Sequence, residues 1–273
     1  MQFVLITRHD LEDTNALFRA ACTARGMAYC EVEAGQARSA ELGSTAPRLI
    51  YTAATDWNSR LLEKLIARPG DALLHDPHFI CDHQPSLLKR AGVPMARAVY
   101  APDLSNLQNQ VAWLGGFPVV VKRPGLEGGQ GISIAHDLDD LTAQLGAADA
   151  SGAMIEAYIA HDICWRLTVL DGRVLAESAS APAADDFRSN AAGGRVVERL
   201  PVPEQAGKIA IDAVRALRLG FGGVDLMAAQ DGRLIVAEVN FPCYFADQQA
   251  RLGVDIAGAI VDHLVANSGA MKV

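Results

Sequence analysis

Long apolar runs, paired cysteines and dense basic tracts are all scarce in this chain of 273 residues. Half of the residues are hydrophobic (50%), yet no run approaches the roughly 20 apolar residues that span a bilayer. The first residues, MQFVLITRHD, also lack the basic start and long apolar stretch of a secretory signal. We therefore expect a soluble cytoplasmic protein without a membrane partner.

The cysteines do not form the patterns that indicate disulfides or zinc. Their number is odd and no CxxC pair occurs among Cys22, Cys30, Cys81, Cys164 and Cys243. An odd set without paired spacing is typical of reduced thiols that pack in the interior. The seven histidines likewise show no metal-ligand spacing, so none receives a catalytic role.

Basic charge is low as well, since the formal net charge is -8. Binding to nucleic acids is driven by neutralisation of phosphates, so this composition excludes a nucleic-acid partner. Anionic small molecules are still compatible with it, because a local basic cluster overrides net charge.

Segments with strand and helix patterns alternate in the first 80 residues. Strands are predicted at 2–7 and 48–53, and helices at 15–25 and 57–67. Such alternation is typical of a small α/β domain. We place its end at residue 80, followed by units at 81–158 and 159–273.

The rest of the chain reads mainly as hairpins. The β-branched run 117–122 and the strand 131–135 flank a glycine-rich stretch, and Asp171-Gly172 and Asp231-Gly232 each separate two apolar runs. Aspartate followed by glycine between such runs is the strongest local hairpin signal. The segment 253–266 is predicted to be an amphipathic helix.

The glycine-rich stretch is the first chemical signal. Lys122 ends a buried strand, and the string EGGQG that follows at 127–131 contains three glycines. Glycine lets backbone amides turn toward phosphate oxygens, and a lysine supplies positive charge, so the pattern suggests a nucleoside triphosphate. A flexible turn without a ligand is the alternative. Neither the GxxxxGK[ST] loop nor the GxGxxG fingerprint is present.

An acidic set forms the second signal. Glu238 and Asn240 are two apart on one predicted strand and point to the same face, and Asp225 can lie opposite them across a hairpin. Oxygen ligands of this kind suit magnesium. Solvent-facing polar positions are the alternative, but the apolar flanks LIVAEVNF would make a bare carboxylate costly there.

A third signal is the polar loop DDFRSNAAGG at 185–194, which contains Arg188 and Asn190. An arginine fork binds phosphoryl groups with two hydrogen bonds. As an isolated string the loop is equally compatible with a surface turn.

These strings occur together in a known order. FPVVVK, EGGQGISI, MIEAYI, DICWRLTVLDGRV, DDFRSNAAGG, GGVDLM and VAEVN follow one another as in RimK-like ATP-grasp ligases, and the chain resembles that family from about residue 80 to the end. The resemblance implies an α/β (α+β) protein: an ATP-grasp fold of two α+β lobes enclosing ATP, after a small Rossmann-like N-terminal domain.

The resemblance also implies roles for individual residues. ATP would be bound by Lys122, Glu127, Gly128, Gly129, Gly131, Glu156, Ala157, Tyr158, Ile159 and Asp162. One or two Mg²⁺ ions, with Mn²⁺ as a substitute, would be held by Asp225, Glu238 and Asn240. The substrate carboxylate and the moving phosphoryl group would be oriented by Arg166, Arg188 and Asn190.

The chain departs from the family at three places. In the glycine-rich stretch, two more residues than usual separate Lys122 from EGGQG, and Gly129 and Ser133 replace the family's threonine or serine and its last glycine. Relatives usually carry a phosphate-binding lysine before the AGxP turn, whereas this chain reads FICDHQPSLLKRAGVP, where His83, Lys89 and Arg90 are the alternatives. After EVN it continues FPCYF instead of the family's small residue, serine or threonine, proline and glycine. Those aromatics are candidates for either a substrate pocket or the core, and Cys243 is expected to pack.

The leading hypothesis is an ATP-dependent ligase that activates a carboxylate as an acyl phosphate and joins it to an amine, with glutamate or another amino acid as one substrate. Its partners are small-molecule acids and amines, and a homo-oligomer is left open. A regulatory ATP-binding protein without turnover and a small-molecule kinase are the alternatives.

Overall fold

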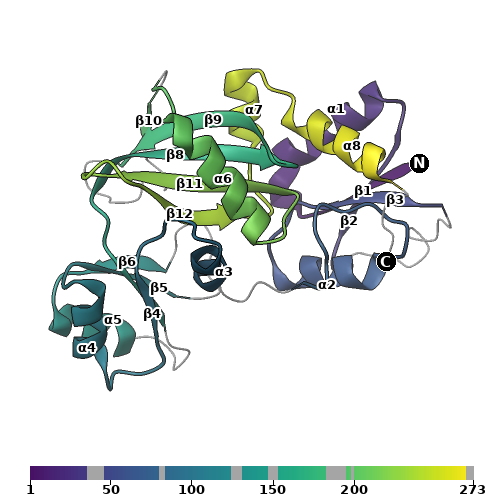
Figure 1. Cartoon of the computed structure of the whole chain (residues 1–273). Coiled ribbons are helices and arrows are strands. Elements are labelled where there is room, and N and C mark those ends of the chain that lie inside the picture. Colours follow the sequence, from purple (N-terminus) through teal and green to yellow (C-terminus); the bar gives the residue numbers. More distant parts are fainter. Residues whose placement is uncertain are drawn as a thin grey trace.

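The structure, a computed structural model, describes residues 1–35, 46–79, 84–123, 131–146, 153–182, 195–197 and 200–268, the segment 195–197 by its backbone alone. Three sheets organise the chain (Figure 1). Within the described ranges, no helix is both long and apolar enough to cross a membrane. The first sheet is parallel and the other two are antiparallel, so the chain has a mixed α/β architecture.

The N-terminal unit is a parallel sheet in the order β2-β1-β3. Its elements are β1 (Gln2–Thr7), η1 (His9–Leu11), α1 (Glu12–Ala24), β2 (Ala28–Glu33), β3 (Arg48–Thr52) and α2 (Trp57–Ile66). Helix α2 begins where the Asp56 carboxylate accepts a hydrogen bond from the Ser59 N–H at 3.0 Å, as an N-cap residue does.

The central lobe is a four-stranded sheet in the order β4-β7-β5-β6. It contains β4 (Ala98–Ala101), α4 (Leu107–Leu114), β5 (Val119–Lys122), β6 (Ile132–Ala135), α5 (Leu138–Gly146) and β7 (Ala153–Ala157). The predicted hairpin of two strands around the glycine-rich stretch corresponds to β5 and β6, which pair in antiparallel register. Strand β5 begins after Pro118, whose nitrogen cannot donate to the ladder.

The C-terminal lobe is a five-stranded antiparallel sheet in the order β10-β9-β8-β11-β12. Its strands are β8 (His161–Leu170), β9 (Arg173–Ala181), β10 (Arg195–Val197), β11 (Phe221–Ala229) and β12 (Leu234–Asn240). Asp171 and Gly172 both have positive φ, 47° and 71°, as a type I′ hairpin turn requires.

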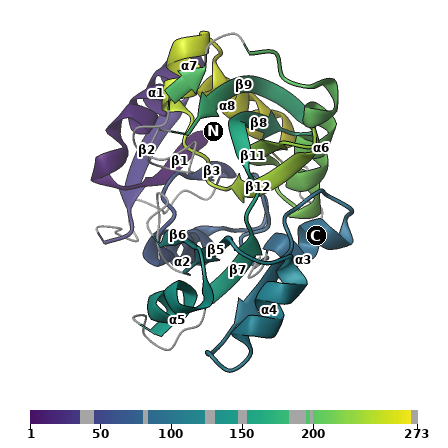
Figure 2. The same ribbon diagram turned by 90° about the vertical axis from the view of Figure 1, so that its left-hand side faces the viewer.

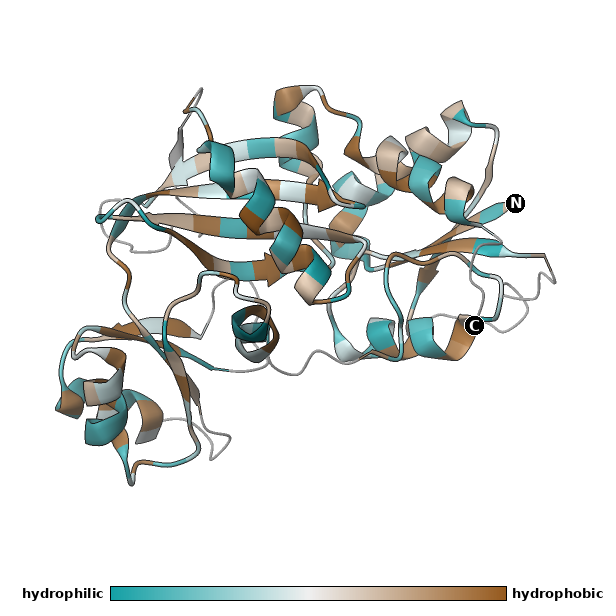
Figure 3. Cartoon of the chain, in the orientation of Figure 1, coloured by the Kyte–Doolittle hydropathy of each residue, from teal (hydrophilic) through white to brown (hydrophobic). Residues whose placement is uncertain are grey.

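Helix α6 (Glu204–Ala216) covers one face of this sheet, with polar residues on its outer side (Figure 3). The sequence interpretation did not include this helix. Helix α3 (Gln84–Arg90) contacts α6 and buries Leu88 in the same apolar cluster.

The two helices at the end of the chain, α7 (Ala246–Leu252) and α8 (Ile256–Asn267), pack beside the N-terminal unit (Figures 1 and 2). Side chains of α8, such as Ile260 and Leu264, share one core with Phe3 and Phe18 of that unit. We propose the division at residues 80 and 158 as the domain organisation, with α3 and α8 packing across it.

This shared core leads to a stability prediction. Ile260→Ala should lower the free energy of unfolding by about 2–5 kcal/mol, because Ile260 is fully buried and its loss leaves a cavity. Val265→Ala on the same helix, at a side chain 39% exposed, should change it by less than about 1 kcal/mol. Chemical denaturation measures both, and equal losses would contradict the assignment of α8 to the core.

Candidate active site

A cavity of about 670 Å³ lies between the three sheets. The N-terminal unit contributes Thr14 and Tyr51 to its lining, the central lobe Lys122, and the C-terminal lobe Arg166 and Asp225. Ligand sites for small molecules span roughly 300–1,000 Å³, so the cavity is large enough for a nucleotide with a substrate beside it.

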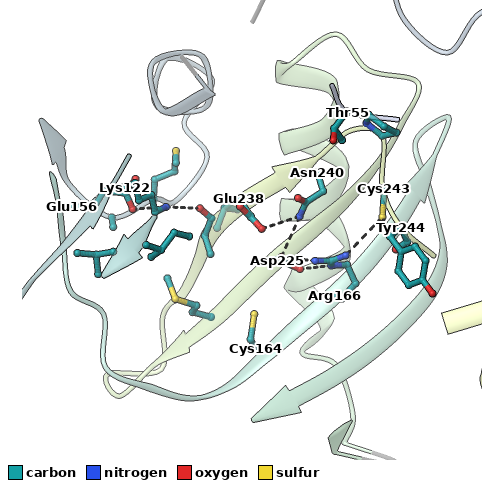
Figure 4. A pocket seen from close by; sticks show the side chains of 18 of the residues that line it. Thr55, Lys122, Glu156, Cys164, Arg166, Asp225, Glu238, Asn240, Cys243 and Tyr244 are labelled. Carbon is teal, nitrogen blue, oxygen red and sulfur yellow. Dashed lines mark hydrogen bonds and ion pairs between the residues drawn. The ribbon is translucent and has the colours of Figure 1, made fainter. Parts of the chain in front are cut away.

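One end of the cavity carries Lys122 between apolar walls (Figure 4). The Lys122 Nζ forms an ion pair with Glu156 Oε2 at 2.7 Å and donates to the Ala237 carbonyl at 3.5 Å. Met95 and Val236 line this region. Apolar walls with one cation suit the base and the first phosphates of a nucleotide.

The middle of the cavity holds an ion pair that the sequence did not indicate. Asp225 on β11 is directly opposite Arg166 on β8 and Glu238 on β12. Arg166 donates to both carboxylate oxygens of Asp225, from Nη2 at 2.7 Å and from Nε. Burial opposes the charge on Arg166, but Asp225 outweighs it and raises the pKa of the guanidinium.

Asn240 joins the two carboxylates. Its amide donates to Glu238 Oε1 at 3.1 Å and to Asp225 Oδ2 at 3.3 Å (Figure 4). Burial, and then the negative charge of Asp225, raise the pKa of Glu238. The negative charge of Asp225 and Glu238 would therefore be stabilised by an added cation.

The residues present fit a magnesium ion. Two carboxylates and one amide oxygen are hard ligands, and Mg²⁺ completes its shell with water and phosphate oxygens. Among the residues that the structure describes, no three His, Cys, Asp or Glu side chains gather so as to hold a metal ion, so this site needs the Asn240 amide beside its two carboxylates. Arg166 donates hydrogen bonds to both oxygens of the Asp225 carboxylate. A metal ion bound to Asp225 must therefore share this carboxylate with Arg166 or displace the guanidinium.

The predicted nucleotide strand lines the cavity with Glu156, Ala157, Tyr158 and Ile159. Two of its backbone groups already have partners within the protein: the Ala157 N–H donates to the Arg97 carbonyl at 2.9 Å, and the Ile159 carbonyl is 2.8 Å from His161 Nδ1. These bonds leave fewer backbone groups of this segment for contacts with ATP.

Other predicted residues lie apart from the cavity or outside the described residues. Asp162 is exposed and does not line it, whereas its neighbour His161 does. Gly131 precedes β6 with φ of 86° and accepts from the Arg123 N–H. Five residues of the prediction lie outside the described ranges: Glu127, Gly128, Gly129, Arg188 and Asn190.

The N-terminal unit supplies cavity residues that the sequence interpretation missed. Arg8 and Thr55 line the cavity: Arg8 follows β1 directly, and Thr55 lies in the segment just beyond the end of β3. Ligands of parallel α/β sheets lie beyond the carboxyl ends of the strands. The position after each predicted strand was therefore a signal that could have identified both residues.

The segment FPCYF contributes to both the core and the cavity. Phe245 is buried in the core against Phe18 and Phe221, whereas Pro242, Cys243 and Tyr244 line the cavity. Burial raises the pKa of the Cys243 thiol, which keeps it protonated and agrees with a packing role.

The helix before the AGxP turn offers no replacement for the missing lysine. Lys89 and Arg90 are exposed on α3 and do not line the cavity, and Lys89 Nζ is 5.9 Å from the centre of the Trp113 ring. His83 lies outside the described residues.

Comparison with known proteins identifies the family. The family model of the RimK-like ATP-grasp domain matches residues 83–264. The chain belongs to the RimK-like ATP-grasp family. It is 30% identical over 203 residues to a probable alpha-L-glutamate ligase of Xanthomonas campestris pv. campestris, covering 72% of this chain and 68% of the relative. A probable alpha-L-glutamate ligase 2 of Pseudoalteromonas atlantica is 31% identical, covering 67% and 62%.

Solved ATP-grasp structures share the whole fold. The ligase PsnB with a minimal precursor superimposes with a TM-score of 0.72 at 21% identity, covering 97% of this chain and 98% of the other. A RimK domain protein from Sphaerobacter thermophilus gives 0.70 at 19% identity, covering 97% and 100%. The expected family, fold class and activity are confirmed. The protein is an ATP-grasp ligase that joins a carboxylate to an amine.

A close contact beneath Arg166 generates a prediction for this ATP-grasp ligase. Gly223 has no room for a Cβ, which would overlap the Cys243 Sγ and lie 3.2 Å from Arg166 Cδ. Gly223→Ala should therefore destabilise the protein by about 1–3 kcal/mol through overpacking. Adding Cys243→Ala removes the sulfur and should restore part of the loss in thermal unfolding. A double variant less stable than Gly223→Ala would refute this contact.

Proposed function

We propose that ATP lies with its first phosphates at Lys122 and its terminal phosphates at Asp225, Glu238 and Asn240. The observation that supports this is the order of groups along the cavity: a cation at the nucleotide end, two carboxylates with an amide in the middle, and Arg166 beyond them. This order matches what phosphoryl transfer needs, which is charge neutralisation and alignment with little covalent participation by the protein.

Asp225, Glu238 and Asn240 are the residues we propose as ligands of one or two Mg²⁺ ions. When bound, the metal would neutralise the negative charge of the triphosphate. Two solved PsnB structures contain Mg and ADP, which supports the choice of metal for the fold. Mn²⁺, which accepts the same oxygen ligands, is the expected substitute.

Arg166 is the group that we propose to orient the substrate acid. Its guanidinium lines the cavity while it is bound to Asp225, so a carboxylate placed beside it would lie next to the proposed phosphate site. One oxygen of the substrate carboxylate attacks the γ-phosphorus of ATP. ADP is released, and the substrate becomes an acyl phosphate. The amine nitrogen then attacks the acyl carbon, inorganic phosphate leaves, and an amide is formed.

We propose an amino acid, with glutamate as the first candidate, as one substrate. The support comes from two relatives of similar sequence that carry the name probable alpha-L-glutamate ligase. Pro242, Cys243 and Tyr244 replace the small residues usual after EVN and line the substrate end of the cavity, which favours a co-substrate different from that of other family members.

The test of this function combines three readouts. The protein is incubated with ATP, magnesium, glutamate and a pool of acids and amines, and ADP, phosphate and a new amide mass are followed together. Equal amounts of all three support the ligase. A phosphorylated acid released without an amide indicates a kinase, and tight ATP binding without ADP indicates a regulatory protein.

The carboxylates of the proposed metal site lead to a prediction about turnover. Glu238→Gln and Asp225→Asn should each lower kcat by about 100-fold or more, because each removes negative charge that would hold the metal near the developing transition state. Asp231→Asn is the matched control, since its carboxylate is bound to Arg233 in an exposed turn. Activity unchanged in either site variant would exclude the proposed ligand set.

A second prediction concerns nucleotide affinity. Lys122→Met should raise KM for ATP by about ten-fold with a smaller effect on kcat, because a charge-assisted contact to phosphate is lost. Lys208→Met, at a side chain 81% exposed on α6, serves as the control. Steady-state kinetics with ATP as the varied substrate measure both, and an unaltered KM in Lys122→Met would oppose this placement of the phosphates.

A further inference from the structure

A second cavity, of about 220 Å³, adjoins the segment that follows Asn240. Phe241 lines this cavity, whereas Pro242 lines the main one. The two cavities therefore share this short segment as a wall. The ligase reaction proposed above uses only the main cavity.

Helix α2 forms an apolar side of the second cavity. Trp57 and Leu61, 71% and 40% exposed, line it at helical spacing, and Leu65, 73% exposed, continues the same stripe. Phe79 and Leu219 line it as well. We name the second cavity together with this stripe the α2 groove. Contiguous exposed apolar side chains of this kind mark sites where another molecule binds.

Positive charge surrounds the α2 groove. Arg60 and Lys64 line it, and the Arg218 guanidinium is 4.7 Å from the centre of the Phe79 ring. Its one lining carboxylate within the described residues is Glu63, which is buried and bound to Thr52 at 2.7 Å.

Among the described residues at the groove, the carboxylates of Glu63 and Asp76 offset part of this charge, and three basic side chains exceed them. Glu63 also has His75 Nε2 at 3.1 Å, so both of its oxygens are engaged inside the protein. Asp76 is exposed on the adjoining loop and accepts the His78 N–H at 2.9 Å. A basic rim around an apolar surface is unusual on a chain with a net charge of -8.

We propose that the α2 groove binds an acidic peptide segment that carries an aromatic or aliphatic side chain. The apolar side chain would pack on Trp57 and Leu61, and neighbouring carboxylates would pair with Arg60 and Lys64. A second copy of the chain fits less well. A two-fold axis at Leu61 would bring the basic residues of both copies together, and like charges facing each other oppose association.

The groove also contacts residues that fix the proposed metal site. Gln84 lines it and exchanges two hydrogen bonds with Val239, from Nε2 to the carbonyl at 2.8 Å and from the Val239 N–H to Oε1 at 3.2 Å. Arg60 Nη2 donates to the Phe241 carbonyl at 2.9 Å. A bound peptide would thus contact two side chains, Gln84 and Arg60, that hold the backbone on both sides of Asn240.

Binding is tested directly on the full-length protein. The probe is a short fluorescent peptide that alternates aspartate with phenylalanine and leucine, and its counterpart has lysine in place of each aspartate. Fluorescence anisotropy should give at least about ten-fold tighter binding for the acidic peptide, with affinity falling as salt rises. Equal affinity for the two peptides, or no binding of either, would overturn the proposal.

Variants locate the binding site. Trp57→Ala and Lys64→Glu should each weaken the acidic peptide by about ten-fold, since one removes an aromatic anchor and the other reverses a charge. Trp113→Ala is the matched control, because Trp113 is also half-exposed but lies on α4 of the central lobe. Circular dichroism checks that all three variants fold.

Two outcomes contradict this location. An equal loss of peptide affinity in Trp113→Ala would place the peptide elsewhere. Sedimentation that shows a dimer dispersed by Trp57→Ala, with no peptide binding, would assign the groove to a second copy. Neither result bears on amide formation, which is assayed separately, so this proposal and the proposed ligase reaction fail independently.

Discussion

Asp225 and Glu238 face each other across neighbouring strands in the wall of the main cavity. Two carboxylates so close together and so poorly hydrated require compensating positive charge or hydrogen bonds. Arg166 and Asn240 meet this requirement within the protein. A nucleotide with its divalent ion would bring both further charge and new ligands to the same point, so the electrostatics of binding and of chemistry depend on one small group of side chains.

The strand pattern predicted this group because alternation is local. Glu238 and Asn240 are two residues apart, and the aspartate-glycine turn indicated the strand opposite them. The Arg166 partner of Asp225 could not be predicted in this way, since it depends on β8 pairing with β11 across more than fifty residues of chain. The residue types alone could not show which residue of β8 lies opposite Asp225, because this depends on the register of two strands far apart in the sequence.

Helix α6 was missed for a different reason. Its buried face includes Ala206, Ala210 and Ala213, and its sequence is as strongly amphipathic as that of the predicted helix α2. The helical pattern was therefore present in the sequence and was overlooked. For the cavity residues of the N-terminal unit, the strand ends were a local signal for Arg8 and Thr55, but only packing between units brings them to the cavity. Secondary structure and the middle of the site were therefore readable from local patterns, whereas the walls built between units were not.

The core that contains α8 distributes rigidity unequally through the molecule. One apolar cluster joins the first sheet to the last helix, whereas the cluster of the central lobe draws all its members from residues 99–157. The first and last parts of the chain consequently share one core and form a single packed body. The central lobe, which carries Lys122, has a core of its own, so a change in its orientation would leave both clusters intact.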